Sequence, residues 1–241
     1  MEIELFDGRV KAIIDPQGAW ITNLSDEYGD VLFPKRTLEE ADGSKKVRGG
    51  CHICLPNFGP GGTTNLPQHG FARTALWEVV SSTATTAELY LSKGLDMYKT
   101  LHAGLAFEID GNALLMTLSV TNNGLDTLRV APGFHPYFMT ARGEDSVVID
   151  DESVQVEELG EVQFVTDNSS HILLANKTRY MLDADGLSTW AKWTDNLGSY
   201  VCIEPTVAGF SFLKSDPSVK ELLMPSETRK YSLRIAWDRS R

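Results

Sequence analysis

The sequence HAGLAFEIDGNALLMTLSVTNNG, at residues 102–124, contains two apolar runs separated by Asp110 and Gly111. An Asp-Gly pair between two such runs is a strong short-range signal for a β-hairpin. The second run, LLMTLSVTN at residues 114–122, alternates only imperfectly between apolar and polar residues. We therefore expect two antiparallel strands here, the second of them packed on both faces.

Similar β-rich runs punctuated by turn residues continue on both sides of this hairpin. Further strands are expected within residues 10–33, 86–92, 199–205, 209–214 and 229–237. Many short strands separated by turn residues indicate an all-β fold, either a sandwich or a barrel.

Helical periodicity is weak throughout the chain. Only residues 36–43, RTLEEADG, could hold a helical turn, and residues 217–224, PSVKELLM, fit either a helix or a strand. The sequence therefore predicts no long helix.

Length and charge restrict the classes of function. The chain has 241 residues and a net charge of −11. All-β folds of this length commonly form one domain, so a single domain over residues 1–241 is expected. The negative charge opposes nucleic-acid binding, and no apolar run is long enough to span a membrane. The first residues lack a secretory pattern and the three cysteines are too few for a disulfide scaffold, so we expect a cytoplasmic protein.

The segment at residues 49–74 differs from its surroundings. It holds six glycines and three prolines in 26 residues, so much of it should be a loop, and long ordered loops are often functional. Its Cys51-His52-Ile53-Cys54 sequence could indicate a metal or redox site. On a strand, however, Cys51 and Cys54 would point to opposite faces, so we favour packing and expect no metal site.

Cationic residues gather in and just before this segment. His69 is followed four positions later by Arg73, and Arg48 lies in the sequence KKVRGG at residues 45–50. The arginines could bind a phosphate or carboxylate group through bidentate hydrogen bonds, or they could be ordinary solvent-exposed side chains. The sequence alone leaves both interpretations open.

Two further residues are candidates for acid–base chemistry. Glu204 ends the apolar run YVCIEP, where it shares one strand face with Cys202. His135 lies in GFHPYF, where Pro136 and Tyr137 would hold the imidazole in place. Histidine titrates near neutral pH, and a carboxylate in a cleft can serve as a general base. Taken separately, a surface glutamate at the end of a strand and a structural histidine among aromatic residues are the more common interpretations.

Four motifs in this order resemble a known family: RGGCHICLPNFG, QHGFARTALW, GFHPYF and VCIEP. Together they resemble the aldose 1-epimerase, or galactose mutarotase-like, superfamily, and most closely its hexose-6-phosphate mutarotase branch. The resemblance runs through most of the chain. It implies a large antiparallel β-sandwich and an isomerase that interconverts the α and β anomers of a sugar.

The resemblance also implies a role for each matching residue. His135 would donate a proton to the ring oxygen, and Glu204 would remove the proton from the anomeric hydroxyl. His69 would help to hold the sugar, and Arg48 and Arg73 would contact the phosphate. The ring would open, the C1–C2 bond would rotate, and closure would give the other anomer without a cofactor or a metal ion.

Some positions match the family less closely. Phe58 could form part of a sugar platform or simply pack in the core. A further family acid contacts the sugar hydroxyls, and Asp167 is the candidate for it here. The segment CHICLPNFG carries a histidine and an asparagine where relatives usually have apolar or aromatic residues. Two alternative functions are a neutral-sugar aldose 1-epimerase and a non-catalytic carbohydrate-binding sandwich. In each case we expect the protein to act as a monomer or a homodimer.

Overall fold

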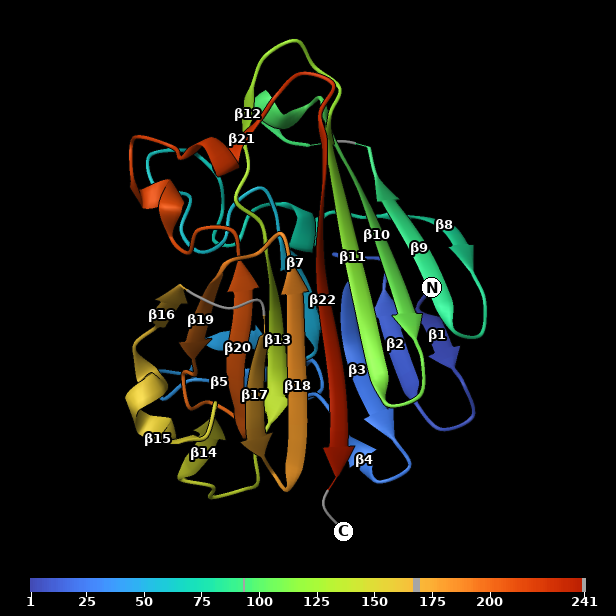
Figure 1. The fold of residues 1–241 in the computed structure, drawn as a ribbon, viewed down its shortest axis with the longest axis vertical. Coiled ribbons are helices and arrows are strands. Elements are labelled where there is room, and N and C mark those ends of the chain that lie inside the picture. The colour runs from blue at the N-terminus through green and yellow to red at the C-terminus, as the bar shows by residue number, and fades with distance from the viewer. Residues whose placement is uncertain (93, 167–169, 240–241) are drawn as a thin grey trace.

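Two large antiparallel sheets form the computed structural model of the protein, which describes residues 1–92, 94–166 and 170–239 (Figure 1). In the order in which they pair, the strands of the first sheet are β1 (Ile3–Phe6), β2 (Lys11–Asp15), β3 (Trp20–Asp26), β7 (Cys51–Cys54), β13 (Gly133–Met139), β20 (Tyr200–Thr206), β19 (Thr189–Trp193) and β16 (Gln163–Thr166), with β4 (Gly29–Asp30) paired to β3.

The second sheet carries the longest strands. In pairing order they are β15 (Glu152–Gln155), β14 (Ser146–Ile149), β17 (Ser170–Ala175), β18 (Thr178–Asp185), β22 (Thr228–Arg239), β11 (Ala113–Asn122), β10 (Leu101–Ile109), β9 (Thr86–Leu91) and β8 (Glu78–Ser82). Two small ribbons complete the fold, β5 (Arg36–Glu39) with β6 (Lys45–Arg48) and β12 (Leu128–Arg129) with β21 (Leu222–Leu223).

The predicted hairpin is confirmed. Strands β10 and β11 pair from Leu101 and Asn122 down to Ile109 and Leu114, with Gly111 in the turn at a φ of 57°. Along β11 alternate residues are buried, while those between them are only partly covered. The expectation that this strand packs on both faces is therefore wrong, because only one face of this sheet meets the core.

Two local expectations are also wrong. Residues 36–39 form strand β5 rather than a helical turn, because β6 pairs with them and Leu38 packs against the cluster around Phe33. Residues 209–214 contain a 3₁₀ turn, Ser211–Leu213, rather than a strand. The Arg129 guanidinium donates hydrogen bonds to the Ser211 and Lys214 carbonyls, so those carbonyls do not join a sheet.

The ambiguous segment at residues 217–224 turns out to be mixed. It contains a 3₁₀ turn, Val219–Glu221, followed directly by the short strand β21. No helix in the described ranges has the length and apolar character needed to cross a membrane.

The central strands of the first sheet are buried on both faces. On one face, side chains such as Ile53, Phe134 and Ile203 join the main core between the sheets. Because side chains alternate, the opposite face of the same strands carries His52, His135 and Glu204. This second face is the floor of the candidate site. Cys51 and Cys54 belong to different clusters, as the alternation predicted.

Gly50 fixes the position of strand β7, which supplies part of this floor. It has a φ of +67°, and a Cβ atom there would lie 1.7 Å from the Ile21 carbonyl oxygen. Gly50→Ala is expected to lower the free energy of unfolding by about 3 kcal/mol, since a backbone clash adds to the left-handed strain. Urea unfolding would measure the loss.

Gly111→Ala is the matched control, because its φ is +57° and a Cβ there would meet nothing within 4 Å. It should cost only the left-handed strain of about 1–2 kcal/mol. Equal losses in the two variants would contradict the clash at Gly50.

Candidate active site

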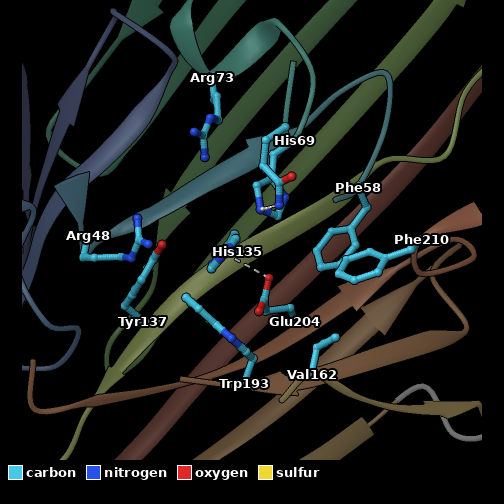
Figure 2. A pocket seen from close by; sticks show the side chains of 11 residues that line it. Arg48, Phe58, His69, Arg73, His135, Tyr137, Val162, Trp193, Glu204 and Phe210 are labelled. Carbon is cyan, nitrogen blue, oxygen red and sulfur yellow. Dashed lines mark hydrogen bonds and ion pairs between the residues drawn. The ribbon is translucent and has the colours of Figure 1, made fainter. Parts of the chain in front are cut away.

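A pocket of about 240 Å³ opens on the second face of the first sheet. Six of the seven predicted site residues line it: Arg48, Phe58, His69, Arg73, His135 and Glu204. Gln68, Tyr137, Val162, Trp193 and Phe210 complete the lining (Figure 2). The seventh predicted residue, Asp167, lies outside the described residues.

His135 and Glu204 form a direct pair on the floor of the pocket. Strands β13 and β20 pair Gly133 with Thr206 and Tyr137 with Cys202, a register that sets His135 opposite Glu204. The Nε2 atom of His135 lies 3.2 Å from a carboxylate oxygen of Glu204, and both side chains are almost fully buried. The Tyr137 ring stacks on the imidazole at 4.7 Å and 10°, which agrees with the expected role of Tyr137 in holding it.

Burial governs the protonation of this pair. Loss of solvent, followed by the neighbouring imidazoles and the Arg73 and Arg48 cations, holds the pKa of His135 well below its usual range. Burial raises the pKa of Glu204 well above its usual range. Both shifts favour the uncharged forms of the pair, a neutral imidazole and a protonated carboxyl group. The 3.2 Å separation is short enough that a proton moved from the carboxyl group to Nε2 would give an imidazolium beside a carboxylate.

His69 reaches the pocket from the loop after β7. Its Nδ1 atom accepts a hydrogen bond from the Gly59 backbone N–H at 3.2 Å and lies 3.2 Å from Cys54 Sγ. Because Nδ1 is an acceptor, the proton of the neutral ring is on Nε2, and the Gln68 side-chain amide 3.3 Å away must turn its oxygen rather than its NH₂ group towards that proton. His69 therefore offers the pocket a hydrogen-bond donor.

The protonation of His69 gives a testable pH dependence. Burial and the Arg73 and Arg48 cations lower its pKa to about 3, against about 6.5 in an unfolded chain. Below pH 6.5 the unfolded chain therefore binds a proton that the folded chain does not, so stability falls as pH falls. His69 contributes about 1.4 kcal/mol of this loss per pH unit between pH 6.5 and 3.

His69→Gln should therefore weaken the pH dependence of the free energy of unfolding in this range by about 1.4 kcal/mol per pH unit, the contribution of one proton. Urea unfolding at pH 7, 6, 5 and 4 would measure it. An unchanged slope would mean that His69 is already protonated in the folded protein.

The two arginines differ in their partners. Arg48 Nε donates to Asp195 at 2.8 Å, and its guanidinium lies over the Trp193 ring. The Tyr200 hydroxyl donates to the same carboxylate, which fixes it in place. By contrast, no acidic side chain in the described ranges forms an ion pair with Arg73. The positive charge of Arg73 is thus less neutralised by nearby carboxylates than that of Arg48.

The walls of the pocket are chemically distinct. Arg48 and Arg73 lie on one side, and Phe58 and Phe210 lie on the other (Figure 2). The two phenyl rings stack at 6.0 Å and 25°. A ligand with one charged end and one less polar face would fit this arrangement.

Sequence reasoning did not identify Asp195 or Gln68 as site residues, and it noted His52 only as an unusual residue. Asp195 is separated from its partner Arg48 by 147 positions, so no local pattern marks it. His52 pairs with His135 across β7 and β13, and their rings lie 4.7 Å apart. Its departure from the family pattern was the one available signal.

Comparison with known proteins identifies the family. The family model described as aldose 1-epimerase matches residues 1–189. The chain belongs to the aldose 1-epimerase family. This is a family of isomerases, so the predicted family is confirmed, and with it the enzyme class.

Individual relatives of this aldose 1-epimerase family member are distant. A Cenchrus ciliaris protein named for glucose-6-phosphate 1-epimerase activity is 39% identical over 62 residues, which is 26% of this chain and 18% of that protein. The match thus spans less than a fifth of the curated relative.

Solved structures share the fold at low sequence identity. The Slr1438 protein from Synechocystis is 18% identical, with a TM-score of 0.78 over 100% of this chain and 96% of its own. A galactose mutarotase-like protein from Lactobacillus casei is 13% identical, with a TM-score of 0.79 over 99% of this chain and 100% of its own. The predicted antiparallel mutarotase-like sandwich is therefore confirmed.

Proposed function

We propose that the protein is a mutarotase that interconverts the α and β anomers of a hexose 6-phosphate. The observation that carries this proposal is the buried His135–Glu204 pair, 3.2 Å apart, on the floor of a pocket bordered by two arginines. The relative named for glucose-6-phosphate 1-epimerase activity supports the choice of a phosphorylated sugar.

The pair has the proton content that ring opening requires. In its charged form, imidazolium His135 gives its Nε2 proton to the ring oxygen, and carboxylate Glu204 takes the proton of the anomeric hydroxyl. The C1–O5 bond breaks and a C1 carbonyl forms. The pair ends with one proton, as it began, now on the carboxyl group. After rotation about C1–C2, the reverse transfers close the ring on the other face.

The arginines explain why a phosphate would assist this chemistry. Burial is the largest cause of the lowered pKa of His135, and both cations lower it further, which works against its role as an acid. A phosphate bound between Arg48 and Arg73 would cancel much of that effect and favour the imidazolium form. Local attraction by the two guanidinium groups would offset the repulsion of an anion by a chain of net charge −11.

The remaining wall residues would position the sugar. His69 would donate from Nε2 to a sugar oxygen, and Phe58, with Phe210, would form an apolar platform against the ring. Asp167 is the proposed contact for the sugar hydroxyls. The reaction requires neither a cofactor nor a metal ion. We also propose a single domain over residues 1–241 and a cytoplasmic location, with the protein acting as a monomer or a homodimer.

Anomer exchange measured by NMR would test this function. Purified protein should accelerate interconversion of glucose 6-phosphate well above the buffer rate, and above its effect on glucose or galactose at equal concentration. Faster exchange of a neutral sugar would favour a neutral-sugar aldose 1-epimerase. Sugar binding in a calorimeter without any acceleration would instead favour a non-catalytic carbohydrate-binding protein.

A further inference from the structure

Cys202 lies beside the acid–base pair but has no part in the proposed reaction. It precedes Glu204 by two positions on β20, so both side chains are on the pocket face of the sheet. It is fully buried and is the cross-strand partner of Tyr137, whose ring stacks on His135. Ligand atoms of His135, Cys202 and Glu204 all lie within 4.8 Å of one another.

This group of nitrogen, sulfur and oxygen donors suits a zinc ion. In a tetrahedral site with bonds of 2.0–2.3 Å, ligand atoms are about 3.5 Å apart, so the group needs to close by only about 1 Å. His135 and Glu204 already meet the requirement at 3.2 Å. Three protein ligands would leave the fourth position open towards the pocket, as in zinc sites that exchange their outer ligand.

We propose that His135, Cys202 and Glu204 form a reversible binding site for Zn²⁺, and that Zn²⁺ inhibits the enzyme by occupying its acid–base pair. The inhibition rests on the proposed mutarotase function, whereas the binding does not. Coordination would release the Cys202 thiol proton and the proton shared by His135 and Glu204. Zn²⁺ with two anionic ligands and one neutral ligand leaves the buried site without net charge.

Two features make the site reversible rather than a permanent cofactor site. His135 Nδ1 has no hydrogen-bond partner among the described residues, whereas a tightly held zinc ligand usually donates its second ring N–H to an acceptor. The Arg48 and Arg73 cations at the same pocket also oppose a divalent cation. The cysteine thiolate favours Zn²⁺ over Mg²⁺ or Ca²⁺, which prefer oxygen ligands.

Titration with Co²⁺, a spectroscopic substitute for Zn²⁺, would test the binding directly. The wild-type protein should bind one Co²⁺ with a thiolate-to-cobalt charge-transfer band, and Zn²⁺ should remove that band. Cys202→Ala should lose the band and bind Zn²⁺ about 100-fold more weakly. Cys51→Ala is the matched control, because Cys51 is an equally buried cysteine on the opposite face of the sheet, and it should retain both.

Exchange measurements under the same conditions would test the inhibition. Zn²⁺ should stop anomer exchange by the wild-type and Cys51→Ala proteins, and a chelator should restore it. Cys202→Ala, with Cys202→Ser as a second variant should the first fail to fold, should need about 100-fold more Zn²⁺.

Failure of each claim has a distinct signature. A wild-type protein without the thiolate band, or equal Zn²⁺ affinity in the Cys202 variants, would overturn the site. Binding with the band but without inhibition would overturn the inhibitory role. Absence of anomer exchange before any metal is added would instead contradict the proposed function and leave the binding result standing.

Discussion

Glu204→Gln should lower the enzyme-catalysed rate of anomer exchange by about 10²–10⁴-fold, the range expected when a positioned general base is lost. Glutamine has nearly the same size as glutamate and can occupy the same place beside His135 Nε2, so the pocket should retain its shape. It cannot accept the proton of the anomeric hydroxyl. NMR exchange spectroscopy with glucose 6-phosphate would measure the loss in kcat.

The controls separate chemistry from folding. Glu152→Gln makes the same change on the exposed strand β15 and should leave the rate unchanged. Unfolding by urea would show whether the Glu204 variant is folded under assay conditions. A folded Glu204→Gln protein that works within about twofold of the wild type would exclude Glu204 as the base.

Arg73→Ala should reduce kcat/KM for glucose 6-phosphate by about 30- to 1,000-fold, or about 2–4 kcal/mol of transition-state binding. The reason is that Arg73, unlike Arg48, has no acidic partner among the described residues, so its charge is available for a phosphate. For glucose the same variant should change kcat/KM by less than about threefold, because no phosphate contact is lost. Parallel assays with the two sugars would give the ratio.

Arg48→Ala provides the comparison within the same pocket. Asp195 already compensates Arg48 at 2.8 Å, so we expect a smaller loss with the phosphosugar than for Arg73→Ala. Equal losses on glucose and glucose 6-phosphate in the Arg73 variant would contradict a phosphate contact and point to a general structural role.

Local sequence patterns predicted those parts of the fold that depend on neighbouring residues. The Asp110-Gly111 turn and the alternation along β20 are examples, because each is fixed by side-chain period or turn chemistry over a few positions. Residues 36–39 were misassigned because their strand conformation depends on pairing with β6. Propensity alone does not reveal such a partner.

The candidate site also has a part that the sequence predicts and a part that depends on the three-dimensional arrangement. The four motifs indicated His135, Glu204, His69 and the two arginines, and the structure brings all five to one pocket. The ion pair of Arg48 with Asp195 and the proximity of Cys202 to His135 could not be read from the sequence. The proximity of Cys202 to His135 depends on the pairing of β13 with β20, and the Arg48 contact joins the β5–β6 ribbon to the residues after β19. The order of strands in the first sheet, β7–β13–β20–β19, is not their order along the chain.

Because β13 lies in the middle of the first sheet, the part of the pocket that it forms should be more stable against local unfolding than the part formed by the loop at His69. This strand is hydrogen-bonded on both sides, to β7 and β20, so its backbone amides should exchange with solvent only when the whole domain unfolds. Gln68 and His69 lie in a loop outside the two large sheets, which single contacts such as the hydrogen bonds between His69 and Gly59 hold in place, so amides there should exchange through smaller local openings. The proposed acid–base residue His135 should thus keep its place up to the melting of the domain, whereas the proposed sugar contact His69 should not.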